Sequence, residues 1–199
     1  MKRSLTSELL VFAFLVSLGA LTRIYFHQVH AFPNFSPVAA MSLFAGYFFS
    51  RRGLATAVAP CVMVASDSVI GGYVWQMMLV VYAMLTLPSA LGMFMQNRLV
   101  MKPGKARMNW ASGASLLACS LSSSILFFAV TNLVWWPWSN LYEKSLAGLF
   151  ESYERALPFF KYTLAGDVVF GLLLFGIYGL LVQINVLNVS SNQKAETTC

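Results

Sequence analysis

The chain has 199 residues, of which 58% are hydrophobic and 10% charged, and its mean hydropathy is +0.69. A soluble domain carries about 25% charged residues, so this composition excludes an ordinary soluble protein and indicates an integral membrane protein. The formal charge of +6 does not indicate nucleic-acid binding, because the basic residues lie in short clusters between apolar segments rather than along a stripe.

The first apolar segment, residues 5–26, follows a basic start, as in a signal peptide. Apolar sequence resumes directly after Ala20 and the small-residue cleavage pattern is weak, so we expect a retained first transmembrane helix. Ala13, Ser17 and Ala20 are spaced by four and three residues and form a smooth face. Such a face lets helices approach closely, either inside the protein or against another membrane subunit.

Five further apolar segments follow, at residues 37–49, 54–70, 75–95, 114–134 and 164–184. A spanning helix needs about 20 residues, so the short second segment is either a tilted span or one that enters only part of the bilayer. The positive charges favour a complete span: with a cytoplasmic N-terminus, nine of the 13 Lys and Arg residues fall on the inner side. We therefore expect six transmembrane helices in one membrane domain, residues 1–189, with both termini cytoplasmic and a disordered tail at 190–199.

A long connection, residues 135–163, is predicted on the outer side. Trp135, Trp136 and Trp138 are typical of the aromatic belt at a membrane interface. The apolar spacing within residues 142–157 predicts a short amphipathic helix on the outer surface. This helix either tethers the fifth and sixth spans or acts as a lid.

Polar residues in the apolar segments gather at one depth. Arg23, Asp67 and Asp167 lie near the predicted outer ends of the first, third and sixth helices. A charge deep in a span costs on the order of 2.5–3.5 kcal/mol, so these side chains should face the protein interior or water in an outward-facing pocket. Arg23 could hold a carboxylate or phosphate, and the aspartates could accept hydrogen bonds or bind a cation. The predicted substrate-binding residues are Arg23, Asn34, Asp67, Tyr73, Asn132, Trp135, Trp136 and Asp167.

Each charge also has a purely structural interpretation. Asp67 could pair with Arg23 and lock two helices together, and Arg23 could instead reach the lipid headgroups. Asp167 could favour the positive end of the sixth helix.

Catalytic and metal-binding patterns are weak. Intramembrane aspartic proteases carry Gly-x-Gly-Asp, whereas the chain has Leu-Ala-Gly-Asp ending at Asp167, and Ser66 rather than tyrosine precedes Asp67. His27 and His30 have no third ligand nearby, and the three cysteines, Cys61, Cys119 and Cys199, have no metal-site spacing. We therefore predict no enzyme, no cofactor and no metal site.

The segments FPNFSPVAAMSLFAGYFF, ASDSVIGGY, SSSILFFAVTN and YERALPFFKYTLAGDVVFGLLLFG resemble a family of uncharacterised bacterial membrane proteins described as candidate transport proteins. The resemblance covers roughly residues 20–180. That family is similar in size and helix count to the substrate-binding S components of energy-coupling-factor (ECF) vitamin transporters.

The resemblance implies an all-α, six-helix S-component-like bundle in the bacterial inner membrane that takes up a small solute. It also implies a membrane coupling subunit and ABC-type ATPases as partners. The S-component docking motif is Ala-x-x-x-Ala on the first helix, and the nearest match here runs from Ala13 to Ser17. The chain has no Walker pattern, so ATP-derived energy would come from a partner. The alternatives are a non-transporting membrane scaffold and a membrane-embedded enzyme.

Overall fold

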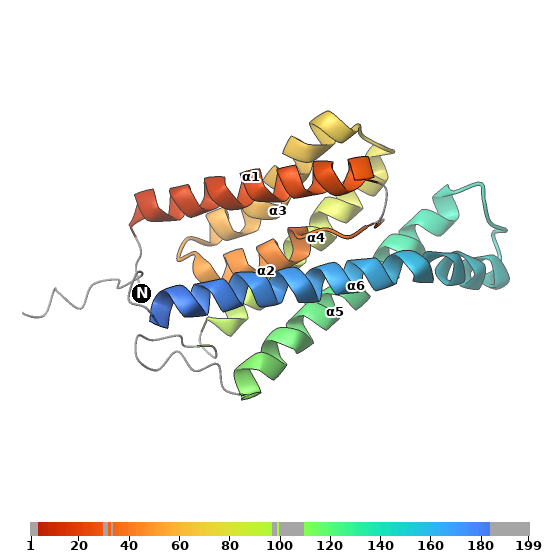
Figure 1. Ribbon diagram of the computed structural model, residues 1–199. Helices are drawn as coiled ribbons and strands as arrows, with labels where there is room; N and C mark the ends of the chain where they lie inside the picture. The colour runs from red at the N-terminus through yellow and green to blue at the C-terminus, as the bar shows by residue number, and fades with distance from the viewer. Residues whose placement is uncertain (1–3, 30–31, 33, 97–98, 100–109, 184–199) are drawn as a thin grey trace, which may run out of the picture.

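The structure is a computed structural model, and it describes residues 4–29, 32, 34–96, 99 and 110–183. These residues form six helices and no strand (Figure 1). The predicted tail at 190–199 and the predicted domain end at residue 189 lie outside the described residues. The helices are α1 (Leu5–Val29), α2 (Val38–Phe48), α3 (Arg52–Ile70), α4 (Trp75–Met95), α5 (Trp110–Trp138) and α6 (Leu146–Gln183).

Successive helices run in alternating directions, so the start of α1 and the end of α6 lie at the same end of the bundle (Figure 1). Five helices, all except α2, are long and apolar enough to cross a membrane. Large apolar side chains such as Leu10, Leu79 and Leu180 point outward and are more than half exposed. A soluble monomer rarely exposes so much apolar surface, whereas a lipid-facing surface requires it.

The prediction of a sixth full span is corrected by the length of α2. Its 11 residues extend only about 16 Å at 1.5 Å per residue, against a hydrocarbon core of about 30 Å. Ten of these residues are buried, because the longer helices surround α2. It is the central helix of the bundle rather than a lipid-facing one.

The close approach of α2 and α4 depends on two glycines. A Cβ atom on Gly46 would lie 1.9 Å from the carbonyl oxygen of Ser89, and one on Gly92 would lie 2.0 Å from that of Leu43. Each glycine therefore contacts the backbone of the other helix, as small residues do where membrane helices pack. This contact holds α2 against α4 in the core of the bundle.

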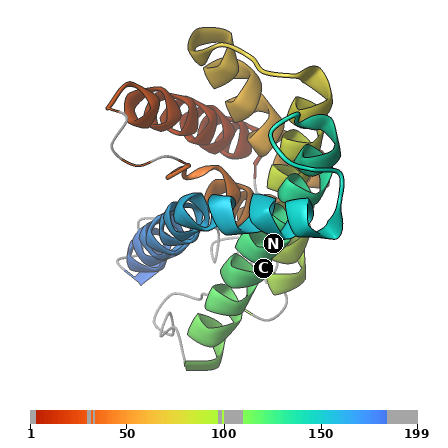
Figure 2. The same ribbon diagram turned by 90° about the vertical axis from the view of Figure 1, so that its right-hand side faces the viewer.

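The predicted amphipathic helix within residues 142–157 is not a separate element. Residues 146–157 form the first turns of α6, which continues without a break to Gln183, so the connection from α5 is only residues 139–145. Pro158 removes one helical hydrogen bond without ending the helix. Figure 2 looks at this end of the bundle and shows the first turns of α6 lying across it.

Helix α1 is anchored at its start by a buried carboxylate that the sequence analysis did not single out. Glu8 is 0% exposed. Its two oxygens accept hydrogen bonds of 2.8 Å from Arg51 Nη1 and from the backbone N–H of Ser50. The charge is thus paired and solvated by the protein, which burial of a carboxylate demands.

The small residues of α1 are divided between two environments. Ala20 is buried, whereas Ala13 and Ser17 are exposed. Gly19, which lies next to Ala20, packs against Met41 and Val62. Ala20 of the predicted smooth face therefore packs within the bundle, whereas Ala13 and Ser17 lie on the exposed side of α1.

Candidate functional site

A cavity of about 660 Å³ opens at the end of the bundle where α1 ends and α4 begins. Such a volume lies within the range of about 300–1,000 Å³ that small-molecule sites occupy. Helix α4 contributes one apolar wall, on which residues three to four apart face the same way. This wall consists of Met77, Val81, Met84, Leu85 and Pro88.

Helices α5 and α6 form the other walls of the cavity, again with residues spaced three to four apart. On α5, Ser123, Phe127, Thr131 and Trp135 recur every four residues. On α6, the corresponding stripe is Ser152, Ala156, Phe160, Thr163 and Asp167. The walls are therefore aromatic and apolar, with hydroxyl, amide and carboxylate groups at a few points, which is the usual make-up of a ligand pocket.

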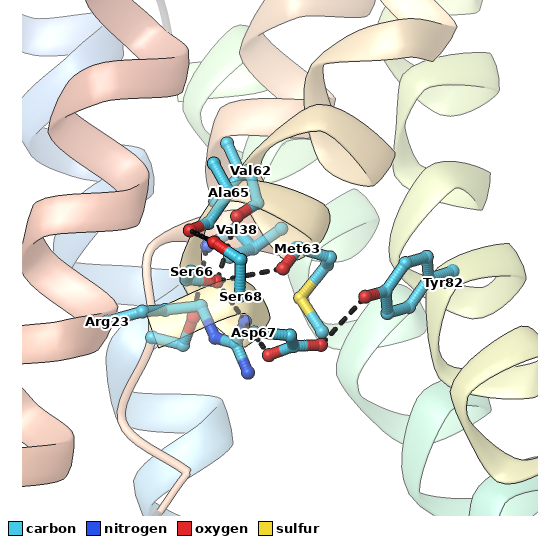
Figure 3. A network of polar contacts seen from close by, with 10 residues as sticks. Arg23, Val38, Val62, Met63, Ala65, Ser66, Asp67, Ser68 and Tyr82 are labelled. Carbon is cyan, nitrogen blue, oxygen red and sulfur yellow. Dashed lines mark hydrogen bonds and ion pairs between the residues drawn. The ribbon is translucent and has the colours of Figure 1, made fainter. Parts of the chain in front are cut away.

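Arg23, Asp67 and Tyr82 form a polar network that joins α1, α3 and α4 (Figure 3). Arg23 Nη1 lies 2.7 Å from Asp67 Oδ1, and it also donates to the hydroxyl of Ser66. The Tyr82 hydroxyl donates to Asp67 Oδ2 at 2.8 Å. Both carboxylate oxygens of Asp67 thus have partners, so this aspartate is held within the protein and only Arg23 reaches the cavity.

Asp167 has a different environment. It is 3% exposed and lines the cavity, and its Oδ2 accepts a hydrogen bond of 2.6 Å from the buried hydroxyl of Ser124 on α5. The adjacent Gly166 lies against the backbone of Ser36, where an added Cβ would come within 3.0 Å. These contacts fix the position of Asp167 between α5 and the start of α2.

The position of Asp167 in its helix also differs from expectation. It was predicted about one turn from the start of the sixth helix, but α6 begins at Leu146, far upstream. The influence of a helix terminus falls off within the first turn. The positive end of α6 therefore does not explain why an aspartate occupies position 167.

Asn34 lies in a tight turn at the cavity wall. Its φ is 65°, and the N–H of Phe35 donates to the carbonyl of Phe32 at 3.2 Å. Asparagine tolerates this left-handed conformation better than most residues, and Pro-Asn in the sequence matches the preference of a type II turn. Strained backbone of this kind concentrates at binding and catalytic sites.

Tyr73 lies in the connection between α3 and α4, outside both helices. Burial first, and then the negative charge of Asp67, raise the pKa of Tyr73 to about 12. Its hydroxyl therefore stays protonated at neutral pH and can donate a hydrogen bond at the cavity wall.

The structure brings six of the eight predicted binding residues to the cavity. These are Arg23, Asn34, Tyr73, Asn132, Trp135 and Asp167. Asp67 lies behind Arg23, and Trp136 donates its indole N–H to the carbonyl of Glu143 at 2.9 Å instead of lining the cavity. The amide of Asn132 donates to Phe128 O in its own helix at 2.7 Å, which leaves its oxygen for other contacts.

Two partners of the aspartates were missed by sequence reasoning. Tyr82 was one aromatic residue within an apolar span, and nothing in its local sequence pointed to Asp67. Ser124 had a weak signal, because it belongs to three consecutive serines within an apolar helix. Hydroxyls in such helices usually bond to their own backbone, as Ser123 does to Cys119 O.

The connection after α5 and the first turns of α6, residues 142–157, form part of the cavity wall. Tyr142, Ser152, Arg155 and Ala156 line the cavity, and the Tyr153 hydroxyl donates to Ala129 O of α5 at 2.6 Å. Residues 142–157 are thus attached to α5 by this hydrogen bond and also cover the cavity. A movement of this segment as a lid stays a prediction.

Among the residues that the structure describes, no group of three or more His, Cys, Asp or Glu side chains is placed to hold a metal ion. Asp67 and Asp167 have separate partners, Arg23 with Tyr82 and Ser124 respectively. The arrangement is therefore suited to holding a molecule by hydrogen bonds, charge and apolar contact.

Comparison with known proteins assigns the family but no activity. No curated protein and no solved structure matches the chain. A family model matches residues 3–189, almost the entire sequence. The chain therefore belongs to this family, which is described as a family of unknown function (DUF6580).

Proposed function

We propose that the protein binds a small solute in the cavity and mediates its uptake across the bacterial inner membrane. The cavity itself carries the proposal, since a volume of about 660 Å³ with a few convergent polar groups is typical of a small-molecule site. Membrane helices otherwise gain stability by close packing, as α2 and α4 do.

The direction of uptake is inferred from charge. The basic residues Arg51 and Arg52 lie at the end of the bundle opposite the cavity, next to the start of α3. Cytoplasmic loops carry an excess of Lys and Arg, so we place this end and both termini in the cytoplasm. The cavity then opens to the outside, where a nutrient arrives.

An ECF-type S component is the form of transporter that we propose. Support comes from the sequence resemblance and from the exposure of Ala13 and Ser17, two small residues four apart on α1 that a coupling subunit could approach closely. ATP hydrolysis would be supplied by ABC-type ATPases in the same complex. Ser17 stands in place of the second alanine of the motif, so the contact surface carries one additional hydroxyl group.

A membrane scaffold without transport activity is the second candidate. One observation favours it: the Arg23–Asp67–Tyr82 network satisfies both oxygens of its carboxylate and needs no ligand. Such a network stabilises helix packing by itself.

The test is gentle extraction of the full-length protein, followed by mass spectrometry of bound small molecules and co-purifying proteins. The proposal predicts a small molecule in near-stoichiometric amount, and the ECF form also predicts ATPase subunits. A preparation with neither, together with unchanged solute uptake after deletion of the gene, would establish the scaffold.

A further inference from the structure

The charged side chains that line the cavity differ in whether they have an ionic partner. Two arginines line it, and each has a carboxylate partner: Arg23 pairs with Asp67 at 2.7 Å, and Arg155 with Glu151 at 2.8 Å. Asp167 also lines it, but in the part of the chain that the structure describes it forms no ion pair. Its partner is a neutral hydroxyl, that of Ser124. Of these three lining side chains, Asp167 is therefore the one without an ionic partner.

Burial makes this carboxylate costly to leave alone. Asp167 is 3% exposed, and a buried ionised carboxylate is unfavourable unless it is paired. One hydrogen bond from Ser124 compensates only part of the lost hydration. A cationic group on a ligand would complete the site, because an opposite charge within about 4–6 Å favours the ionised carboxylate.

The walls near Asp167 are rich in aromatic rings. Phe128 and Phe160 line the cavity with their centroids 4.6 Å apart, and the ring of Phe35, also in the lining, lies against Gly166, the residue before Asp167. Aromatic faces attract cations and also bury apolar groups. The methionines Met77 and Met84 on the opposite wall can adapt to the shape of a bound molecule.

We infer that the solute carries a positively charged nitrogen on an aromatic or otherwise apolar body. The nitrogen binds the Asp167 carboxylate, and the body lies among the aromatic rings and the methionine wall. This inference rests on the proposed function, because it specifies the solute of the same cavity. Arg23 acts here as part of the wall, since its charge is already neutralised by Asp67.

The test uses three probes that share a ring system and differ in charge: naphthylmethylammonium, naphthylmethanol and naphthylacetate. Binding to the full-length protein in nanodiscs is measured by equilibrium dialysis, with empty nanodiscs subtracted to remove partition into lipid. We expect the ammonium to bind at least about 10-fold more tightly than the alcohol, and the carboxylate to bind most weakly. An equal or reversed order overturns the inference.

Variants identify the group responsible. Asp167→Asn should reduce ammonium binding about 10-fold and leave the alcohol unchanged, whereas Glu154→Gln, an exposed carboxylate outside the cavity lining, should change neither. An unchanged preference for the ammonium in a folded Asp167→Asn protein contradicts the inference. If this variant does not fold, the order of the three probes on the unmodified protein still decides.

The experiments also distinguish failure of the cationic-solute inference from failure of the proposed solute binding. A native molecule recovered from the protein that is anionic or neutral refutes the cationic solute while the binding function stands. Absence of a recovered molecule, together with no binding of any probe above empty nanodiscs, refutes both.

Discussion

Arg23 of α1 and Asp67 of α3 form an ion pair with an N–O distance of 2.7 Å, and Tyr82 of α4 completes it by donating to the second carboxylate oxygen. This relationship ties three helices together at the cavity end of the bundle. In this geometry Asp67 lies behind the cavity wall, and Arg23 is the member of the pair that reaches the cavity.

Asp67→Asn should lower the stability of the protein. The change removes the charge partner of Arg23, whose side chain is 18% exposed, and we expect a loss of about 1–3 kcal/mol for a partly buried group left without its partner. The measurement is thermal unfolding in detergent. Glu151→Gln is the control, because an exposed pair four residues apart contributes only about 0.3–0.5 kcal/mol. Equal melting temperatures for Asp67→Asn and the unmodified protein would show that the ion pair does not hold the helices.

Gly46→Ala should disrupt the packing of α2 against α4. The added methyl would lie 1.9 Å from the carbonyl oxygen of Ser89, so the two helix backbones must separate. Overpacking of this kind costs about 1–3 kcal/mol and occasionally more. Gly176→Ala is the matched control on α6, where an added Cβ meets no atom within 4 Å. A protein with Gly46→Ala that melts at the temperature of the control contradicts the placement of α2.

Glu8→Ala should be more damaging than Glu8→Gln. Glutamine keeps an oxygen that can accept the hydrogen bond from the backbone of Ser50, whereas alanine leaves both Ser50 and Arg51 without their acceptor. We expect a difference of about 0.5–1.5 kcal/mol, the usual net contribution of one hydrogen bond, because Ser50 and Arg51 are exposed and water can replace the lost acceptor. Urea or SDS unfolding of the two variants measures it. In a protein that already carries Arg51→Ala, Glu8→Gln should lower the free energy of unfolding by less than it does in the unmodified protein. If the two substitutions lower it by the sum of their separate effects, Glu8 and Arg51 do not form a stabilising ion pair.

Tyr73 should make stability fall at high pH. Its pKa is raised to about 12 in the folded protein, so the folded state keeps a proton that the unfolded state releases near pH 10. Stability from this group is complete below pH 10 and is lost as the pH rises to about 12. Melting temperatures at several pH values test this by comparing the unmodified protein with Tyr73→Phe. The variant should lose less stability over that interval, and parallel curves would contradict the raised pKa of Tyr73.

The helix positions could largely be predicted from the sequence, because apolar runs bounded by polar residues locate spans well. The predicted fourth segment, for example, coincides with α4. The burial of α2 could not be predicted in this way. Lipid and protein interior are equally apolar, so composition does not distinguish a helix facing lipid from one enclosed by other helices.

The continuity of α6 was missed for another reason. Its first turns are amphipathic and the later turns are apolar, and Pro158 lies between them, which is the usual sign of a helix end. At the site, counting residues along the predicted spans pointed to one end of the bundle for Arg23, Asp67 and Asp167, where the first two pair and Arg23 and Asp167 line the cavity. Their partners depend on how the helices rotate against one another, which a single sequence does not specify.

The central claim, that the cavity holds a solute, is tested most directly by filling the cavity. Thr131→Trp places an indole in it, whereas Leu133→Trp adds the same ring to the exposed face of α5. The measurement is the amount of native small molecule recovered by mass spectrometry from equal quantities of folded protein, with Ala156→Phe as a second filling variant. The account predicts that Thr131→Trp and Ala156→Phe lose the molecule and that Leu133→Trp retains it. Full recovery from both cavity-filling variants would contradict it.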